Sequence, residues 1–363
     1  ILSGLVGSEM CIRDSLFSEA VTMNSIVNAR LKQIKPSPSM AAKIVVDELR
    51  RAGREIADFT LGEPDMPTPA HIARAGQAAI AGGDIRYTSP NGTPGLRRAI
   101  ANSLELTLGA KYGLDQITVG AGAKQIISAA LTASLEPGDE VIVCAPYWVS
   151  YPDMVLLNEG KPVVAAGPES QGFKLDAATL EAAITPRTRW LILNSPSNPS
   201  GAVYSRAEMR ALTDVLLRHP RVWILSDEIY APFCYGNEPH VSPVQVEPQL
   251  ADRTLIVNGM SKSYAMTGWR VGYGAGPADL VKAMSTVMSQ STSCPSAISQ
   301  AAAQAALEGD QTSVTDMVAI FKDRRDLIVR RLNAIPGISC ATPDGAFYVY
   351  ANVSGLILSL IHI

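Results

Sequence analysis

Seven short apolar runs, separated by segments of helical spacing, restrict the folds open to this chain more than any other feature. These expected strands lie at residues 117–119, 140–144, 162–165, 190–193, 222–225, 255–257 and 271–273. Helical patterns lie between several of them, for example in residues 125–135 and 206–218. Strands that are apolar throughout and alternate with helices indicate a mostly parallel sheet with helices on both faces. The sequence therefore predicts an α/β fold of three layers.

The predicted sheet belongs to a large domain at residues 61–293, and the segments around it predict a smaller one. We expect residues 23–60 and 294–353 to combine into this smaller α+β domain. Spacing and cap signals predict the elements of this smaller domain and the first two helices of the large domain. They are a helix capped by Ser39, a strand at 56–60, a helix at 71–81, a helix that begins at Thr93 and Pro94, two helices within 296–333, and strands within 338–352.

Both ends of the chain look foreign to the rest of the sequence. Residues 1–22 include Gly-Ser-Glu-Met-Cys-Ile-Arg-Asp-Ser, and residues 354–363 end in Leu-Ser-Leu-Ile-His-Ile. Both stretches resemble translated sequencing-adapter read-through. We expect two non-native tails, a natural start near Met23 and a natural end that has been lost. The alternative is a genuine disordered tail at each end.

Composition excludes several classes of function. Among the 363 residues, 47% are hydrophobic and the mean hydropathy is +0.12, which is typical of a globular enzyme with a large core. A net charge of -3 and a pI near 5.9 argue against nucleic acid as a partner. The five cysteines are scattered, which favours free thiols in a reducing compartment such as the cytoplasm. No metal-ligand spacing appears, and no apolar run is long enough to cross a membrane.

Small or polar residues follow five of the predicted strands, at the point where each strand ends. These clusters lie at residues 120–124, 145–148, 194–201, 226–230 and 261–262. Ligands of an open parallel sheet bind beyond the carboxyl ends of its strands. Each cluster alone also has a structural explanation, such as a turn, a helix cap or core packing. Five of them in one chain order favour a binding site.

The last cluster has the most specific chemistry. Lys262 lies between Ser261 and Ser263 after a buried strand, and Arg270 follows eight positions later. Desolvation lowers the pKa of a lysine and leaves a neutral amine that can attack a carbonyl. Arginine offers a planar fork for a phosphate. An amine and a phosphate clamp are what pyridoxal phosphate needs, although a surface lysine and a structural arginine explain these two residues alone equally well.

The motifs together resemble a known family. Asn-Pro-Ser-Gly at 198–201, Asp-Glu-Ile-Tyr at 227–230 and Ser-Lys-x-Tyr-Ala-Met-Thr-Gly-Trp-Arg at 261–270 are similar to those of the class I/II aminotransferases. These enzymes have fold type I and use pyridoxal phosphate. Leu-Gly-Glu-Pro-Asp at 61–65 and Pro-Tyr-Trp-Val-Ser-Tyr-Pro at 146–152 also match. The resemblance covers residues 28–353 and points to the bacterial aspartate aminotransferase-like group.

This resemblance implies a role for each catalytic residue. Lys262 would bind the cofactor covalently and then move a proton between the substrate and the cofactor. Asp227 would pair with the pyridine nitrogen and keep it protonated. Tyr230 and Asn198 would hydrogen-bond the phenolic oxygen of the ring, and Trp148 would stack on the ring.

The resemblance also implies the phosphate site and the substrate site. The phosphate would be held by Arg270, Ser261 and the backbone of Gly122, Ala123 and Lys124. Tyr87 would reach the phosphate of the neighbouring subunit, which implies a homodimer with shared active sites. The substrate would contact Gly62, Trp148 and Asn198, with Gly62 against its carboxylate.

Three departures from the family pattern affect the expected activity. Ala123 stands where the branch commonly has glycine, and residues 288–291 lack the arginine that animal-type enzymes use for a second carboxylate. The arginine that grips the substrate α-carboxylate in this family lies beyond the end of this chain.

We expect an aminotransferase that acts on an aspartate-like amino acid and a 2-oxo acid such as 2-oxoglutarate. The alternatives are an aromatic or prephenate-type donor, a β-eliminating lyase, the cofactor-binding domain of a transcription regulator, and an inactive cofactor-binding fragment.

Overall fold

The structure of the chain is a computed structural model that describes residues 26–83, 85–236 and 238–357. Its contacts divide the chain into two compact units, residues 1–35 and 36–363. The described part of the first unit contains the short 3-10 helix η1 (Ala29–Gln33). The predicted tail at residues 1–22, and residues 358–363 of the other, lie outside the described residues. All elements below belong to the second unit.

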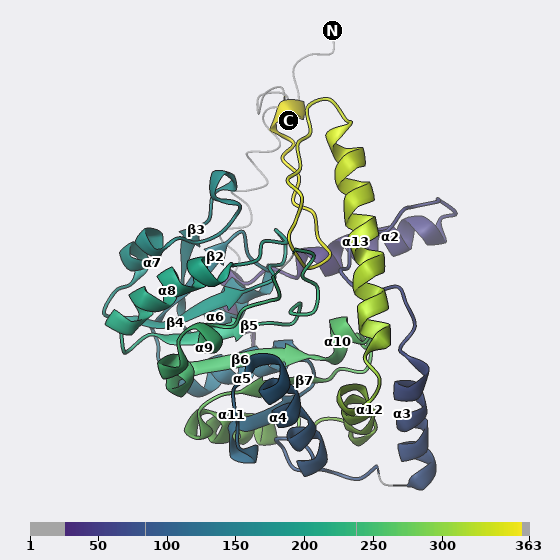
Figure 1. Cartoon of the computed structure of the whole chain (residues 1–363), viewed down its shortest axis with the longest axis vertical. Coiled ribbons are helices and arrows are strands. Elements are labelled where there is room, and N and C mark those ends of the chain that lie inside the picture. The colour runs from purple at the N-terminus through teal and green to yellow at the C-terminus, as the bar shows by residue number, and fades with distance from the viewer. Residues whose placement is uncertain (1–25, 84, 237, 358–363) are drawn as a thin grey trace. The chain divides into compact units, whose positions relative to one another are not determined.

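A mixed, mostly parallel sheet forms the centre of the second unit (Figure 1). Within the described residues it has seven strands in the order β1-β7-β6-β5-β4-β2-β3, and these are β1 (Ile117–Gly120), β2 (Glu140–Ala145), β3 (Lys161–Ala166), β4 (Thr188–Asn194), β5 (Trp223–Asp227), β6 (Thr254–Gly259) and β7 (Gly272–Ala275). Strands β2 to β6 pair in parallel, whereas β7 runs antiparallel to both β6 and β1. Every predicted strand of the large domain is therefore present, and the predicted α/β class is confirmed.

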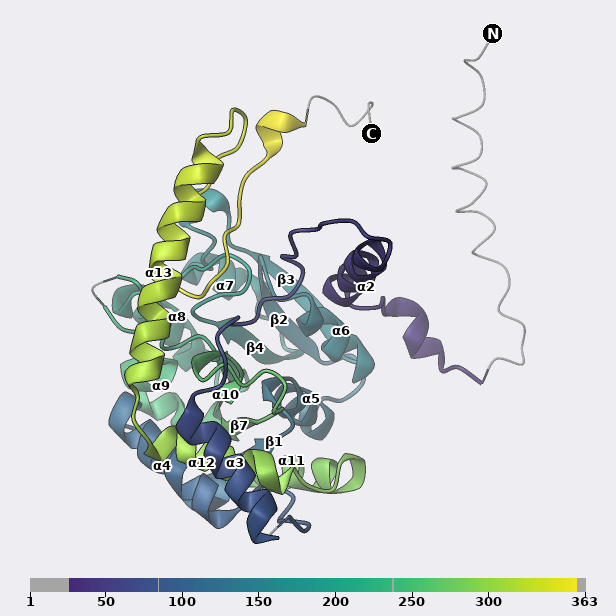
Figure 2. The same cartoon turned by 90° about the vertical axis from the view of Figure 1, so that its right-hand side faces the viewer.

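Helices cover both faces of this sheet, as the three-layer prediction required (Figure 2). One face packs against α5 (Ala123–Ser134), α6 (Ser150–Leu157) and α11 (Ala278–Ser291). The other packs against α7 (Ala177–Ala183), α8 (Arg206–Arg218), α9 (Pro243–Val246) and η4 (Pro248–Arg253). Val141 and Val143 of β2 join the first cluster and Ile142 joins the second, because successive side chains of a strand point to opposite faces.

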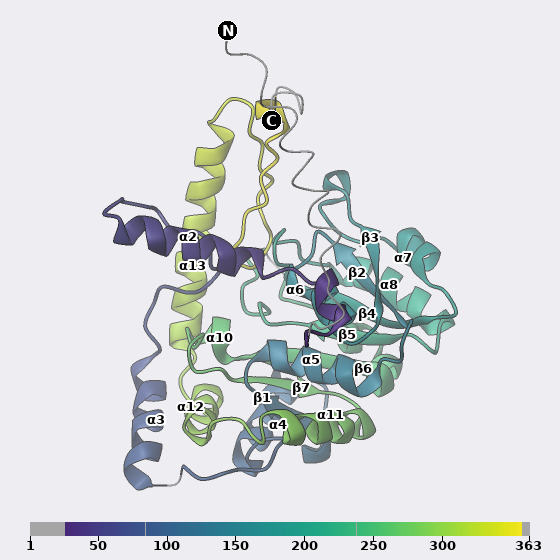
Figure 3. The ribbon, with the colours of Figure 1, turned by 180° about the vertical axis from the view of Figure 1, so that it is seen from behind.

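A third apolar cluster covers the sheet near β1 and β7. It contains residues of α3 (Ala70–Gly82), α4 (Pro94–Leu108) and α12 (Ala297–Glu308), among them Ile72, Leu96 and Ala302. Figure 3 shows α3 beside α12. A Cβ on Gly76 of α3 would lie 2.7 Å from the ring of Trp269, so glycine is required for α3 to pack this closely against that ring.

The predicted helix starts are partly right. Thr93 caps α4, because its hydroxyl accepts the N–H of Leu96 at 3.4 Å and Pro94 occupies the first turn. Helix α2 (Pro38–Arg51), in contrast, has Ser37 rather than Ser39 at its cap position, with Pro38 in the first turn. The fixed φ of proline suits the first turn, and this signal outweighed the later serine.

No strand forms at residues 56–60, all of which are described, and this corrects the prediction there. Asp58 instead accepts hydrogen bonds from the N–H and the hydroxyl of Thr60, at 3.1 and 2.6 Å. It also pairs with Lys43 of α2 at 3.0 Å. An aspartate that binds the backbone two residues further on competes with strand pairing, so this segment bends instead.

The C-terminal helices are confirmed as α12 and α13 (Thr312–Asn333), but the strands predicted within 338–352 are wrong. Only isolated bridges form in this described segment, between Ser339 and Asn352 and between Gly345 and Cys234. The N–H of Gly345 binds the carbonyl of Gly201, so its backbone pairs with a loop rather than with a strand. The remaining short elements are η2 (Leu114–Gln116), η3 (Glu169–Gln171), α10 (Met260–Ser263) and η5 (Ser354–Leu356).

The grouping of residues 23–60 with residues 294–353 into a smaller domain stays a prediction. None of the described helices combines the length and the apolar character that crossing a membrane requires.

Candidate functional site

The polar clusters of the sequence meet at the carboxyl edge of the sheet. Asn194 at the end of β4 pairs in register with Asp227 at the end of β5, and Asp227 pairs with Val257 of β6. Lys262 follows β6 in the short helix α10. Because β7 is antiparallel, Arg270 reaches the same edge just before β7 begins. The sheet topology thus brings the lysine, the acid and the arginine to one place.

These side chains line a cavity of about 880 Å³. The predicted site residues in its lining are Gly62, Ala123, Lys124, Trp148, Asn198, Asp227, Tyr230, Ser261, Lys262 and Arg270. Gly122 is not in the lining but lies against Arg270. Tyr87 is 90% exposed and is not among the lining residues, so the fold of one chain does not bring it to its own cavity.

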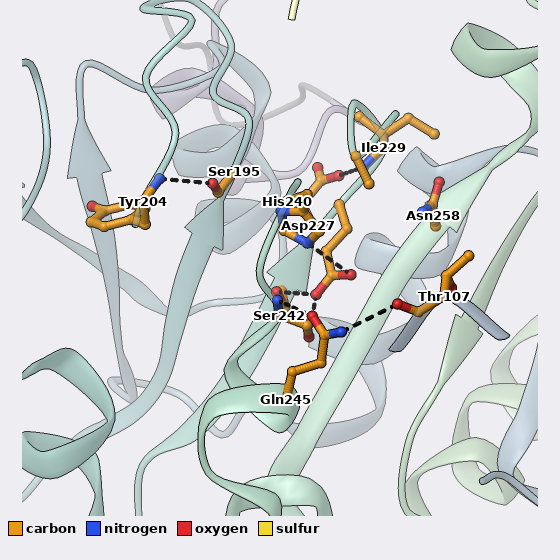
Figure 4. A network of polar contacts seen from close by, with 12 residues as sticks. Thr107, Ser195, Tyr204, Asp227, Ile229, His240, Ser242, Gln245 and Asn258 are labelled. Carbon is orange, nitrogen blue, oxygen red and sulfur yellow. Dashed lines mark hydrogen bonds and ion pairs between the residues drawn. The ribbon is translucent and has the colours of Figure 1, made fainter. Parts of the chain in front are cut away.

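Asp227 is a buried acid at the floor of the site, with 4% of its surface exposed. The hydroxyl of Tyr151 donates to its Oδ2 at 2.7 Å. The N–H of Ile229 donates to its Oδ1 at 3.2 Å (Figure 4). Burial raises the pKa of Asp227 to about 6, although both hydrogen bonds act in the opposite direction. Among the described residues, no basic side chain forms an ion pair with this carboxylate. A protonated ring nitrogen would supply the missing cation.

Lys262 has the lowered pKa that the sequence predicted. Burial lowers its pKa to about 8, and Arg270 lowers it further, while Glu63 and Asp227 oppose this change. Its Nζ donates to the backbone carbonyl of Gly62 and lies 5.7 Å from the ring centre of Phe347. An amine with a pKa near 8 is partly neutral at neutral pH and can attack a carbonyl carbon.

A pair of tyrosines adjoins the lysine. The hydroxyl oxygens of Tyr230 and Tyr348 lie 2.6 Å apart, and burial raises the pKa of Tyr230 well above its ordinary value. The side chain of Asn198 also hydrogen-bonds Tyr230 and opposes that rise. A Cβ on Gly62 would lie 2.1 Å from the hydroxyl of Tyr348, so glycine is required where these segments meet.

An anion cradle lies where α5 begins. Gly122 precedes this twelve-residue helix with φ of 92°, and a Cβ there would lie 2.7 Å from Nη2 of Arg270. Arg270 itself is held by the carbonyls of Thr267 and Ala121, at 2.8 and 3.3 Å. A guanidinium beside the free N–H groups of a helix start is suited to a phosphate.

Lys124 and Trp148 form the wall next to this cradle. Nζ of Lys124 lies 4.7 Å from the ring centre of Trp148 and donates to the hydroxyl of Ser150 at 3.1 Å. Burial lowers the pKa of Lys124, and the nearby Arg270 adds to this effect. The buried uncompensated acid and the cradle together fit a flat ring with a basic nitrogen at one end and a phosphate at the other.

Sequence reasoning missed Tyr151 and Tyr348. Tyr151 lies 76 positions before its partner Asp227, and Tyr348 lies 118 positions after its partner Tyr230. No spacing rule links residues so far apart. The one available signal was that Tyr151 lies inside the Pro-Tyr-Trp-Val-Ser-Tyr-Pro motif that carried part of the family resemblance.

Known proteins are similar to this chain in both sequence and fold. The family described as "Aminotransferase class I and II" matches residues 54–359. An aspartate/prephenate aminotransferase of Cereibacter sphaeroides is 53% identical over 328 residues, which are 90% of this chain and 82% of that protein. An aspartate aminotransferase of Rhizobium meliloti is 50% identical over 342 residues, 91% of this chain and 83% of that protein.

Solved structures extend this similarity to the fold. The crystal structure of the aspartate aminotransferase from Rhizobium meliloti superimposes with a TM-score of 0.88 at 50% identity, over 91% of this chain and 82% of that one. The aspartate aminotransferase from Thermus thermophilus with maleate gives a TM-score of 0.87 at 39% identity, over 93% of this chain and 87% of that one.

Proposed function

This chain belongs to the class I and II aminotransferases, and from this we propose that it transfers an amino group from aspartate to a 2-oxo acid such as 2-oxoglutarate. Members of this family use pyridoxal phosphate. The observation that carries the proposal is the shared cavity of Lys262, Asp227 and Arg270. These three groups supply the amine, the counter-ion for a ring nitrogen and the phosphate clamp.

The residues would divide the chemistry as follows. When bound, pyridoxal phosphate withdraws electrons from the substrate Cα and makes its proton acidic. Nζ of Lys262 lies in the cavity with a lowered pKa, so it can take that proton and return it. The Asp227 carboxylate would pair with the ring nitrogen and keep it protonated. Tyr230 and Asn198 would donate to the phenolic oxygen of the ring.

Binding and orientation would fall to the walls of the cavity. Arg270, Ser261 and the backbone of residues 122–124 would hold the phosphate, and Trp148 would stack on the ring. Gly62, Trp148 and Asn198 would contact the substrate.

A homodimer is part of the proposal. The ring of Tyr87 is almost fully exposed and lies outside its own cavity, which supports a role at the cofactor phosphate of a second copy. The free thiols of Cys144, Cys234, Cys294 and Cys340 support a reducing compartment, the cytoplasm.

Prephenate is a second candidate substrate. The relative from Cereibacter sphaeroides carries both aspartate and prephenate in its name. Several aromatic side chains of the described residues line the cavity, and among them Phe59, Phe321, Phe347 and Tyr348 offer an apolar wall to a ring-bearing substrate. A donor and acceptor panel that includes prephenate with aspartate and 2-oxoglutarate separates the two candidates.

The proposed function is tested by a half-reaction. Addition of aspartate alone to the pyridoxal phosphate-loaded protein should convert the cofactor to pyridoxamine phosphate, as followed by absorbance. Release of ammonia and pyruvate from an amino acid that carries a leaving group on Cβ, such as serine or cysteine, would instead identify a β-eliminating lyase. Lys262→Ala should abolish both the conversion and the borohydride-fixed attachment of cofactor, whereas Lys282→Ala, at an exposed position of α11, should leave them intact. Attachment that survives in Lys262→Ala would refute the assignment.

A further inference from the structure

Tyr151 forms a buried hydrogen bond that the proposed roles leave unused. It lies in α6 with 2% of its surface exposed, and its hydroxyl donates to Oδ2 of Asp227 at 2.7 Å. A hydrogen bond to an ionised acceptor is stronger than a neutral one. The contact therefore ties a helix on one face of the sheet to the acid at the end of β5.

Two donors together fix the orientation of the Asp227 carboxylate. Tyr151 binds one oxygen and the N–H of Ile229 binds the other, at 3.2 Å. Each carboxylate oxygen can accept more than one hydrogen bond, so both keep capacity for a partner in the cavity. Ile229 acts through its backbone, so Tyr151 is the side chain that sets this orientation.

The ring of Tyr151 has a second contact that points to the same ligand. It meets the ring of Trp148 edge-on, with centroids 5.3 Å apart and an interplanar angle of 87°. Trp148 lines the cavity, and both rings belong to one packed cluster with α5 and β2. One side chain thus supports the acid at one end of the proposed ring site and the aromatic wall beside it.

We infer that Tyr151 is a positioning residue for the cofactor: its hydroxyl holds the Asp227 carboxylate, and its ring holds Trp148, in the arrangement that a protonated pyridine ring requires. This inference rests on the proposed function. It assigns to Tyr151 no contact with the substrate and no proton transfer. Its effect passes through Asp227 and Trp148.

The charge of Asp227 makes the inference measurable. The groups that face Asp227 are Tyr151 on α6, Glu228 and Tyr230 after β5, Lys262 on α10, and Tyr348 near the C-terminus. Burial raises the pKa of Asp227 to about 6, and the hydrogen bond from Tyr151 is the largest of the effects that oppose this rise. Loss of the hydroxyl should therefore raise that pKa further, and affinity for a protonated ring should be lost at a higher pH.

The test is a binding titration of cofactor-free protein with pyridoxamine phosphate, which cannot bond covalently to Lys262. In Tyr151→Phe, which keeps the ring, the dissociation constant at neutral pH should rise about tenfold, as loss of a hydrogen bond to a charged group predicts. The pH below which affinity is lost should move upward. Tyr204→Phe is the matched control. The hydroxyl of Tyr204 is buried and accepts the N–H of Leu175 at 2.8 Å, and Tyr204 is not among the residues that line the cavity. It should bind as the wild type does.

A double-mutant cycle separates positioning from general packing. In an Asp227→Asn background, Tyr151→Phe should cause little further loss of affinity, because the partner of the hydroxyl is already neutral. Equal losses in both backgrounds would overturn the inference, as would an unchanged dissociation constant and pH profile in Tyr151→Phe alone. If the wild type does not bind pyridoxamine phosphate, the proposed function fails instead.

A second replacement keeps the test valid if Tyr151→Phe does not fold. Tyr151→3-fluorotyrosine preserves the shape and the hydroxyl but makes the hydroxyl a stronger donor. It should move the pH at which affinity is lost downward, opposite to the shift expected for phenylalanine. An unmoved pH profile in a folded 3-fluorotyrosine protein would overturn the inference.

Discussion

The buried carboxylate of Asp227 should make the cofactor-free protein less stable than it could be. Only 4% of the surface of Asp227 is exposed, and no basic side chain of the described residues forms an ion pair with it; burial raises its pKa from the ordinary 3.8 to about 6. Asp227→Asn removes the charge and keeps the shape. The asparagine amide can still donate to the Tyr151 hydroxyl oxygen and accept from the N–H of Ile229, so both contacts of the carboxylate can persist as hydrogen bonds.

The size of the effect follows from the pKa. At 1.36 kcal/mol for each pKa unit, the difference between 3.8 and about 6 corresponds to about 3 kcal/mol. Because the folded pKa lies above the unfolded one, the folded chain binds an extra proton between these pH values, and its free energy of unfolding falls as pH rises through them. Asp227→Asn should therefore stabilise the cofactor-free chain by up to about 3 kcal/mol at pH 8 and by roughly half as much at pH 5.

The assay is urea unfolding of cofactor-free protein at both pH values and one protein concentration. Asp214→Asn is the control, because its carboxylate is 54% exposed and has only a 3.7 Å contact with Arg210, so little change is expected. Saturation with pyridoxal phosphate should reverse the order, since the wild-type carboxylate then has its cation. A cofactor-free Asp227→Asn protein that is less stable than wild type at pH 8, or a difference that does not vary with pH, would refute the reasoning.

Two further predictions concern the lysine and the phosphate cradle. The rate at which cofactor-free protein captures pyridoxal phosphate should rise with pH and level off above about 8, because the lowered pKa of Lys262 then leaves the amine neutral; stopped-flow absorbance measures this, and a rate still rising at pH 10 would contradict it. Gly122→Ala should weaken cofactor binding about tenfold or more, since its Cβ would meet Arg270. Gly109→Ala is the control with a similar φ of 68° and nothing within 4 Å; equal cofactor affinity in both variants would count against the cradle.

Local patterns were sufficient for the elements that carry the site. Most of the strands are buried on both faces and therefore apolar along their length, as Val141 to Val143 of β2 show, whereas the edge strand β3 is largely exposed. The rule that ligands bind at the carboxyl edge predicts that Asp227 and Lys262 lie close together, and both line one cavity. Both inferences depend on residues that are close together in the sequence.

Patterns failed where a distant partner decides the conformation. Residues 338–352 alternate like a strand, yet the backbone of Gly345 pairs with Gly201 and Cys234, and no spacing in the sequence encodes that choice. Residues 56–60 also alternate, but the contacts of Asp58 with Thr60 and Lys43 bend the chain.

The amino-acid sequence by itself determined the sheet, its helices and the identity of the reactive groups, because burial and turn chemistry act over a few neighbouring residues. The tertiary structure alone decided which hydroxyls support those groups. Tyr151 and Tyr348 reach Asp227 and Tyr230 only after the strands have assembled, and a hydrogen bond between buried side chains depends on distance in space rather than on separation along the chain.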